Sequence, residues 1–232
     1  MASTTTTTTT TAPTGKPTVK FIVEHLEEDL HEWCRLEYAH MIQHVGAGNL
    51  IFSHMHPHIM DELKTNPAGL AAKALCGSEP TPTDVVDLGI PVDRVCLLDM
   101  EAEEELTPAD ASRFDYLLFG GILGDGYQSA DRTSILRAHG FPGRRLGPVQ
   151  MTTDTCVIVS HMVVNGGRPL EEIPFADCPT VRFNKHEAVE LPYRYVGIVD
   201  QDGKVTGPMM APGMFEKLKR DNESDLWDLN LN

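Results

Sequence analysis

Several short segments of this chain are largely apolar along their whole length, without the polar alternation of a half-exposed strand. Asn49–Ser53, Val95–Met100 and Tyr116–Phe119 have this character, and segments with helical spacing or turn residues separate them. Strands of this kind are typical of parallel sheets whose two faces are both covered by helices. The sequence therefore predicts an α/β fold with a mostly parallel sheet and helices on both faces.

The chain divides by composition into two tails and a central region. Residues 1–16 are rich in threonine and poor in apolar side chains, so we expect them to be disordered. We expect a single domain over residues 17–220, because a chain of 232 residues with 41% hydrophobic content can bury one large core. Residues 221–232 combine four carboxylates with leucine and tryptophan, and we expect an acidic tail that is solvated, binds a basic surface of a partner, or folds over the functional site as a gate.

The overall charge restricts the partners of the chain. Nineteen Lys and Arg against 34 Asp and Glu give a net charge of -15, which argues against direct nucleic-acid binding and favours a basic protein partner. Five cysteines without CxxC spacing indicate reduced thiols, and we expect a cytoplasmic protein. The sequence shows neither a membrane-spanning run nor a secretory signal, so we expect no membrane association.

A glycine-rich segment, Phe119–Asp125, follows the apolar run Tyr116–Phe119. It lacks the lysine of a phosphate-binding loop, and its glycine spacing differs from the dinucleotide fingerprint. Glycines allow a backbone to approach a flat ligand closely, and ligands bind at loops beyond the carboxyl ends of parallel strands. The segment therefore indicates either a binding loop or a tight turn without a ligand.

A second loop lies within Arg144–Ser160. It passes from an arginine pair through Gly147-Pro148 to Thr152-Thr153-Asp154, and an apolar helix follows. Each of the last three residues can cap that helix, and Asp154 would also favour the positive end of the helix dipole. Two such loops indicate a small-molecule pocket built largely from backbone, and the alternative is a well-capped core helix.

The histidines have spacings that occur in metal sites. His54, His56 and His58 alternate, and His40 and His44 lie four residues apart. However, Pro57 interrupts the first set, no cysteine has a matching spacing, and no HExxH motif is present. We therefore expect no metal site, but a polar loop and a solvated helix face.

Taken together, these motifs resemble the SPOUT-class methyltransferases, and within them the fungal protein arginine methyltransferases that modify a small-subunit ribosomal protein. The resemblance implies a C-terminal trefoil knot, in which the chain threads through a loop. It spans roughly residues 18–220 and is carried by Phe21–His25, Val95–Asp99, Phe114–Asp125, Asp131–Thr133, Arg144–Thr155, Phe183–Tyr195 and Pro212–Met214.

The resemblance also implies S-adenosylmethionine as cofactor, held by the loops of the knot. Backbone groups can recognise the adenine ring, and apolar side chains such as Ile122, Leu146 and Met151 can enclose it. The implied cofactor-binding residues are Leu118, Phe119, Gly120, Gly121, Ile122, Gly124, Arg145, Leu146, Gly147, Gln150, Met151, Thr153 and Thr155.

An arginine acceptor is protonated in water and must lose a proton during or just after methyl transfer. A carboxylate can orient the guanidinium and assist this loss. By position, the catalytic candidates are Asp125, Asp154 and Glu187, although each can equally be a helix cap or a surface charge.

The acidity of the chain favours a basic small-subunit ribosomal protein as substrate. Two alternatives are an RNA methyltransferase of the same fold and a non-catalytic ribosome assembly factor. The apolar segment Val157–Val164 permits dimerisation or burial within one chain, and the resemblance favours a monomer.

Overall fold

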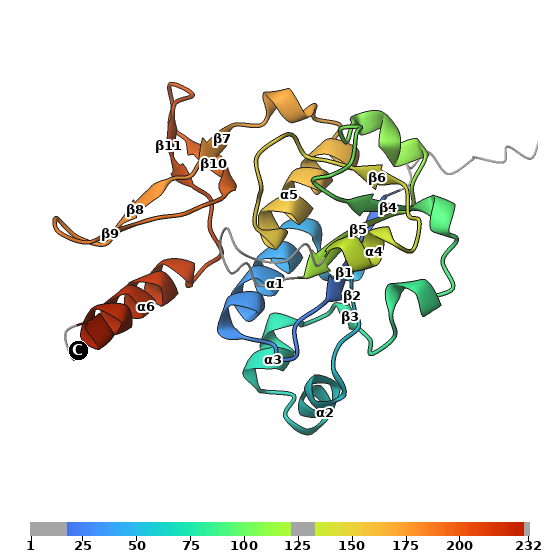
Figure 1. Cartoon of the computed structure of the whole chain (residues 1–232), viewed down its shortest axis with the longest axis horizontal. Helices are drawn as coiled ribbons and strands as arrows, with labels where there is room; N and C mark the ends of the chain where they lie inside the picture. The colour runs from blue at the N-terminus through green and yellow to red at the C-terminus, as the bar shows by residue number, and fades with distance from the viewer. Residues whose placement is uncertain (1–17, 122–132, 230–232) are drawn as a thin grey trace, which may run out of the picture.

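The computed structural model describes residues 18–121 and 133–229, with side chains as far as Glu223. Its centre is a six-stranded sheet in the order β3-β2-β1-β5-β4-β6, and every neighbouring pair is parallel (Figure 1). The predicted parallel sheet is confirmed. The strands are β1 (Lys20–His25), β2 (Leu50–Ser53), β3 (Glu79–Pro80), β4 (Val95–Leu98), β5 (Tyr116–Gly121) and β6 (Gly143–Arg144).

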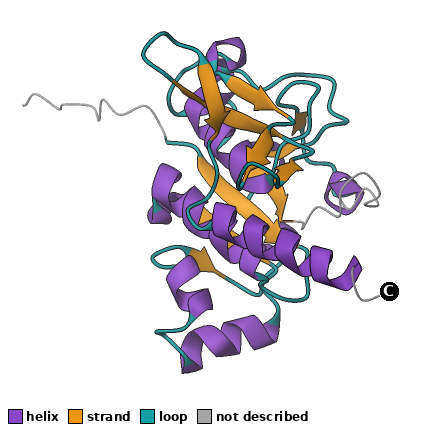
Figure 2. Cartoon of the chain, turned by 90° about the vertical axis from the view of Figure 1, so that its left-hand side faces the viewer, coloured by secondary structure: helices purple, strands orange, loops and turns teal. Residues whose placement is uncertain are grey.

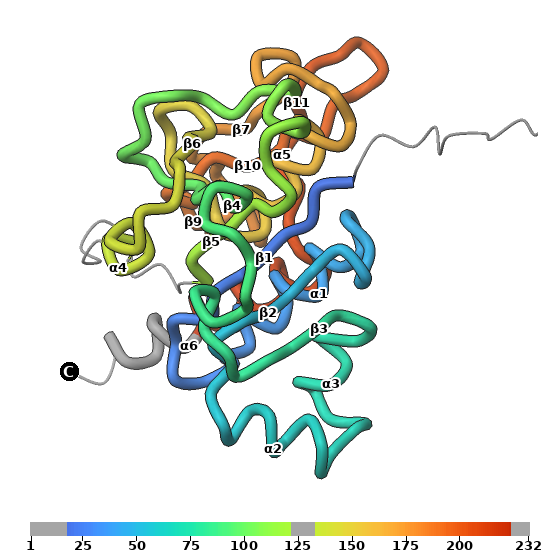
Figure 3. Tube along the Cα trace, turned by 90° about the vertical axis from the view of Figure 1, so that its right-hand side faces the viewer, coloured from blue at the N-terminus to red at the C-terminus, as the bar shows by residue number. Residues whose placement is uncertain are grey.

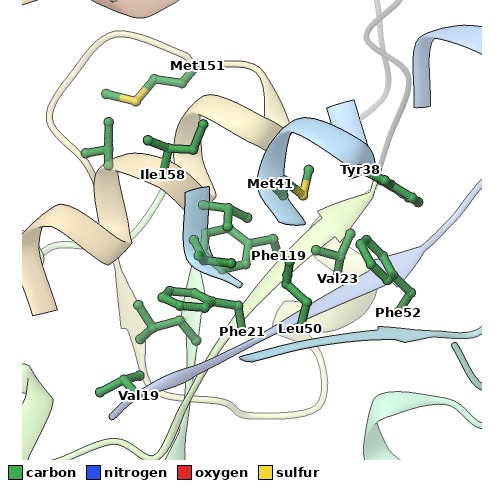
Figure 4. Close-up of a cluster of buried hydrophobic side chains, with 14 of the residues drawn as sticks. Val19, Phe21, Val23, Tyr38, Met41, Leu50, Phe52, Phe119, Met151 and Ile158 are labelled. Carbon is green, nitrogen blue, oxygen red and sulfur yellow. The ribbon is translucent and has the colours of Figure 1, made fainter. Parts of the chain in front are cut away.

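The central strands are apolar throughout because both faces of the sheet are buried. Phe21, Val23 and Phe119 pack in the core beneath α1 (Glu32–Val45) and α5 (Thr153–Val164), as Figure 4 shows. Ile22 and Leu118 point to the opposite face, where a second core includes residues of α4 (Thr133–Arg137) and η2 (Val85–Asp87). Successive residues of one strand therefore enter different cores, which explains the missing polar alternation.

Short helices and turns connect β2 with β4. They include α2 (Pro57–Thr65) and α3 (Leu70–Ala74), which lie at the end of the molecule opposite the C-terminal strands (Figure 1 and Figure 3). The same connection contains the 3-10 helix η3 (Val92–Arg94), and η1 (Ala47–Asn49), η4 (Pro108–Ser112) and η6 (Leu170–Glu172) lie elsewhere in the described part of the chain.

The C-terminal part changes to short antiparallel strands. β7 (Phe175–Asp177), β10 (Arg194–Val199) and β11 (Val205–Pro208) form one sheet, and β8 (Thr180–Arg182) pairs with β9 (Ala188–Glu190). These strands lie on the left of the molecule in Figure 1, the side that faces the viewer in Figure 2. Met151, just before α5, forms a parallel bridge with Arg194, so the returning chain passes next to the β6–α5 loop. Threading of a knot at this place stays a prediction.

The last helix, α6 (Met214–Leu229), includes most of the acidic segment. It packs beside α1, where Arg220 and Glu32 form an ion pair of 2.6 Å and the Lys217 ammonium lies over the Trp33 ring. The acidic segment from residue 221 thus continues a helix that begins at Met214. The predicted disordered tract 1–16 lies outside the described residues. Within the described part of the chain, no helix is both long and apolar enough to cross a membrane.

Candidate active site

The carboxyl end of β5 meets the first turn of α5. Thr153 Oγ1 donates a hydrogen bond of 3.4 Å to the carbonyl oxygen of Gly120, which brings two predicted cofactor-binding residues together. Gly121 ends the strand, and a Cβ at this position would lie 2.6 Å from Tyr38 Oη and 2.9 Å from Val23 Cγ1. These distances leave no room for a side chain, so the end of β5 presents bare backbone.

The other predicted residues of β5 contribute differently. The side chains of Leu118 and Phe119 are 0% and 3% exposed and belong to the cores on opposite faces of the sheet. Only their backbone groups are therefore placed to line a site. Ile122, Gly124 and Asp125 lie outside the described residues.

The β6–α5 loop begins at Arg145, which is paired with the segment around Glu105 as in a β-bridge. The Arg145 amide donates to Glu104 O, and its carbonyl accepts from the Leu106 amide, both at 2.9 Å. Gly147 has a φ of +81°, a left-handed conformation that favours glycine. A cavity of about 210 Å³ opens beside this glycine, and its lining includes Glu105, Leu170, Glu171, Phe175 and Arg194.

The end of this loop is fixed by Arg194 of β10. The Arg194 amide donates to Gln150 O at 2.8 Å, and Met151 is buried against the same strand. The Arg194 guanidinium makes two hydrogen bonds to Asp177, of 2.6 and 2.8 Å, and lies 4.6 Å from the centroid of the Phe175 ring. The loop that carries five predicted cofactor-binding residues, from Arg145 to Met151, is therefore held by the C-terminal sheet.

Asp154 lies at the start of α5, 3% exposed, with both carboxylate oxygens occupied. Its Oδ2 is 2.7 Å from His40 Nδ1. Its Oδ1 accepts hydrogen bonds from Thr152 Oγ1 at 2.6 Å and from the Thr155 amide at 2.8 Å. Thr152 is the N-cap by position, but its hydroxyl bonds Asp154 instead of a free helix amide. Asp154 therefore organises the first turn of α5 from within the core.

A second buried carboxylate, Glu37 of α1, faces Asp154. Trp33 Nε1 donates to Glu37 Oε1 at 2.7 Å, and the Asp154 amide also donates to this carboxylate. Burial raises the pKa of Glu37 well above its usual range, and the nearby Asp154 carboxylate raises it further. Tyr195 of β10 is also buried here, and its pKa is raised by burial and then by the same two acids. We call Trp33, Glu37, His40, Asp154 and Tyr195 the α1–α5 polar cluster.

The sequence analysis missed most of this cluster. The prediction of a solvated helix face is wrong for His40, which is 3% exposed, although His44 is exposed. A signal was present, since Trp33, Glu37 and His40 follow each other at intervals of four and three residues and therefore share one face of α1. What the sequence could not show is that α5 covers this face.

Glu187, the third carboxylate candidate, lies between β8 and β9 and is partly exposed. Its Oε2 accepts a hydrogen bond of 2.5 Å from Asn184 Nδ2, and its carbonyl accepts from the Phe183 amide at 2.9 Å. The side chain thus belongs to a polar turn and keeps contact with solvent, in contrast to Asp154.

The raised pKa of Glu37 predicts a specific dependence of stability on pH. The folded state binds the proton more tightly than the unfolded state, whose carboxyl pKa is near 4.5, so the free energy of unfolding falls as pH rises above that value. The slope is at most about 1.4 kcal/mol per pH unit and ends when the folded-state pKa is passed. Glu37→Gln should remove this contribution, as measured by urea unfolding between about pH 4.5 and 7.

The exposed Glu62→Gln provides the matched control, and we expect it to leave the slope unchanged. An unchanged slope in Glu37→Gln would contradict the proposed protonation of Glu37.

Comparison with known proteins adds to this geometry. The model of a family described as "Protein arginine N-methyltransferase SFM1-like" matches residues 20–225. The chain belongs to this family. Protein arginine N-methyltransferase SFM1 of Saccharomyces cerevisiae is 42% identical over 223 residues, which cover 91% of this chain and 99% of the relative. The predicted resemblance to protein arginine methyltransferases is thereby confirmed.

Solved structures of the SFM1-like family have the same fold. The yeast arginine methyltransferase SFM1 complexed with SAM has a TM-score of 0.75 and 38% identity, over 88% of this chain and 92% of that one. The same enzyme complexed with SAH has a TM-score of 0.73 and 40% identity, over 87% and 95%. The fold around the candidate site is therefore the fold of a methyltransferase that has been solved with SAM and with SAH bound.

Proposed function

We propose that this chain transfers a methyl group from S-adenosylmethionine to an arginine of a basic protein, with a small-subunit ribosomal protein as substrate. The observation that carries the proposal is the 42% identity to yeast SFM1 over 223 residues. The net charge of -15 supports a basic protein as acceptor, because opposite charge speeds the encounter with a lysine- and arginine-rich surface.

The described residues fit the cofactor. Gly121 has no room for a side chain and Gly147 has a left-handed backbone, so both loops offer backbone atoms to a flat group. Thr153 supplies a hydroxyl beside Gly120, whereas the side chains of Leu146 and Met151 are only 5% and 7% exposed and support the loop from the core. We propose that these residues hold S-adenosylmethionine, together with the remaining implied residues of both loops. When bound, it supplies a methyl group activated by a sulfonium.

The three carboxylate candidates have different roles in this proposal. Asp154 is buried with both oxygens occupied, which supports a positioning role for the first turn of α5 and hence for Thr153 and Thr155. Glu187 is partly exposed and Asp125 is the last residue of the glycine-rich segment, so these two are our candidates for orienting the guanidinium and accepting its proton.

We also propose that the protein is a monomer in the cytoplasm. Five apolar side chains of α5 are buried within the chain itself, which leaves them unavailable to a partner copy; Val157, Ile158, Val159, Val163 and Val164 are each at most 1% exposed. We predict a mass near the 25.6 kDa of one chain in light scattering after gel filtration. A mass of about twice this value, independent of dilution, would contradict the prediction.

The substrate assignment has a direct test. The protein is incubated with methyl-labelled S-adenosylmethionine and intact small ribosomal subunits, and the product is digested with protease or with ribonuclease. We expect the label to leave the large fraction after protease treatment only. Loss after ribonuclease only would identify an RNA methyltransferase. Absence of both label and calorimetric cofactor binding would contradict the proposal and favour a non-catalytic assembly factor.

A further inference from the structure

Three potential metal ligands meet at the carboxyl edge of the parallel sheet. Glu24 lies near the end of β1, His54 follows β2, and Asp84 precedes η2. His54 Nδ1 is 3.7 Å from Glu24 Oε1 and 3.4 Å from Asp84 Oδ1. The three ligand atoms all lie within 4.8 Å of one another. Among the described residues they form one compact set of an imidazole and two carboxylates.

These separations fit a bridging cation better than direct hydrogen bonds. In a tetrahedral site with zinc–ligand distances of about 2.1 Å, neighbouring ligand atoms lie about 3.4 Å apart. By contrast, a nitrogen and an oxygen 3.4 or 3.7 Å apart are too distant for a good hydrogen bond. A small movement of His54 would therefore complete a metal site, whereas the present geometry satisfies neither carboxylate by a direct hydrogen bond from the ring.

Glu24 is prepared for such a role. It is 3% exposed, and its Oε2 accepts hydrogen bonds from Ser53 Oγ and from the Val85 amide at 3.1 Å. Both of these donors are neutral, while buried carboxylates are usually paired with a cation or coordinate a metal. The two donors also fix the orientation of the carboxylate, as outer-shell partners of metal ligands do.

The backbone places the other two ligands. His54 has a φ of +54°, a left-handed conformation that is uncommon for a residue other than glycine and recurs at functional sites. Its amide donates to Thr83 O at 3.0 Å, which ties the end of β2 to the segment that carries Asp84. The side chains of His54 and Asp84 are 51% and 48% exposed, so an ion and a water ligand have access.

We propose that Glu24, His54 and Asp84 bind a divalent transition-metal ion, with zinc as the best match to one nitrogen and two carboxylate ligands. The ion would connect β1, β2 and the segment before η2. Because Glu24 pairs with Gly120 in the sheet register, the site lies one strand from the proposed cofactor loop. Its role is to stabilise this edge of the sheet, and no step of methyl transfer depends on it.

The test uses the full chain after dialysis against a chelator, with its thiols kept reduced. Zinc chloride is titrated by calorimetry, and thermal unfolding is followed with and without zinc. We expect one zinc ion per chain and a higher Tm in its presence. His54→Ala and Asp84→Asn should each weaken binding at least about tenfold and abolish most of the Tm increase. Far-UV circular dichroism establishes that both variants are folded.

The control variant is His58→Ala. The rings of His58 and His56 lie 4.4 Å apart, centroid to centroid, on the surface, and this pair could bind zinc adventitiously. We expect His58→Ala to bind zinc as the unchanged chain does. No stoichiometric binding by the unchanged chain, or binding lost in His58→Ala and kept in His54→Ala, would overturn the proposal. Both experiments measure only zinc binding and its effect on stability. Their outcome therefore does not depend on whether the chain transfers a methyl group.

Discussion

Replacement of Asp154 by alanine is expected to lower the free energy of unfolding by about 3 kcal/mol or more, because several buried groups lose their acceptor at once and each unsatisfied one costs about 1–3 kcal/mol. The substitution leaves His40 Nδ1, Thr152 Oγ1 and the Thr155 amide without the carboxylate that they contact in the folded chain. Removal of the Asp154 carboxylate also relieves the charge that raises the pKa of Glu37, so the loss comes from these three groups and not from Glu37. Urea unfolding at a fixed pH measures the loss.

Two further variants show whether the loss of stability comes from the contacts of Asp154 or from the removal of a negative charge in general. Asp154→Asn keeps the shape and one acceptor oxygen, so we expect a smaller loss than with alanine. Asp61→Ala removes an exposed acid, whose ion pair with Lys64 is 70–73% exposed, and should change stability by less than about 0.5 kcal/mol. A loss with Asp154→Ala as small as that with Asp61→Ala would contradict the proposed role of Asp154 as an internal anchor.

Replacement of Gly147 by valine is expected to weaken S-adenosylmethionine binding at least about tenfold, or about 1.4 kcal/mol. The φ of +81° is unfavourable for a side chain, and a Cβ there would lie 3.6 Å from Arg194 Nη1 and 3.8 Å from Leu170 Cδ2. The contacts themselves are ordinary, so the change acts through the backbone of the loop and through the space beside it. Calorimetric titration with the cofactor gives the affinity.

Gly167 supplies the matched control, because it has a φ of +71° and its Cβ would meet nothing within 4 Å. Both valine variants should lose a similar 1–2 kcal/mol of stability, about the value for a left-handed residue with a side chain. Only Gly147→Val should lose cofactor affinity. Equal affinities in the two variants would show that the pocket lies elsewhere. Gly121 is less suitable, since its Cβ would collide with Tyr38 and Val23 in the core and disturb the fold itself.

The parallel sheet could be predicted because its signal is local. A run such as Val95–Leu98 is apolar at each position, and the two cores that receive alternate residues explain this pattern directly.

The polar interior of the site depends on packing between distant segments, which a single sequence does not reveal. His40 and Asp154 are 114 residues apart, and each taken alone has the character of a surface residue or a helix cap. The same holds for the three proposed metal ligands, because Glu24 is an ordinary strand residue until β2 and η2 bring His54 and Asp84 next to it. The spacing of the histidines drew attention to His54 only together with His56 and His58, and on that spacing no metal site was expected.

Identification of the methylated residue tests the central claim most directly. The protein is incubated with methyl-labelled S-adenosylmethionine and small ribosomal subunits, the labelled protein is hydrolysed to amino acids, and the products are separated by chromatography. The account predicts that the label elutes with methylarginine and that Gly147→Val greatly reduces it while Gly167→Val does not. Label in another amino acid or in nucleotides would contradict the account.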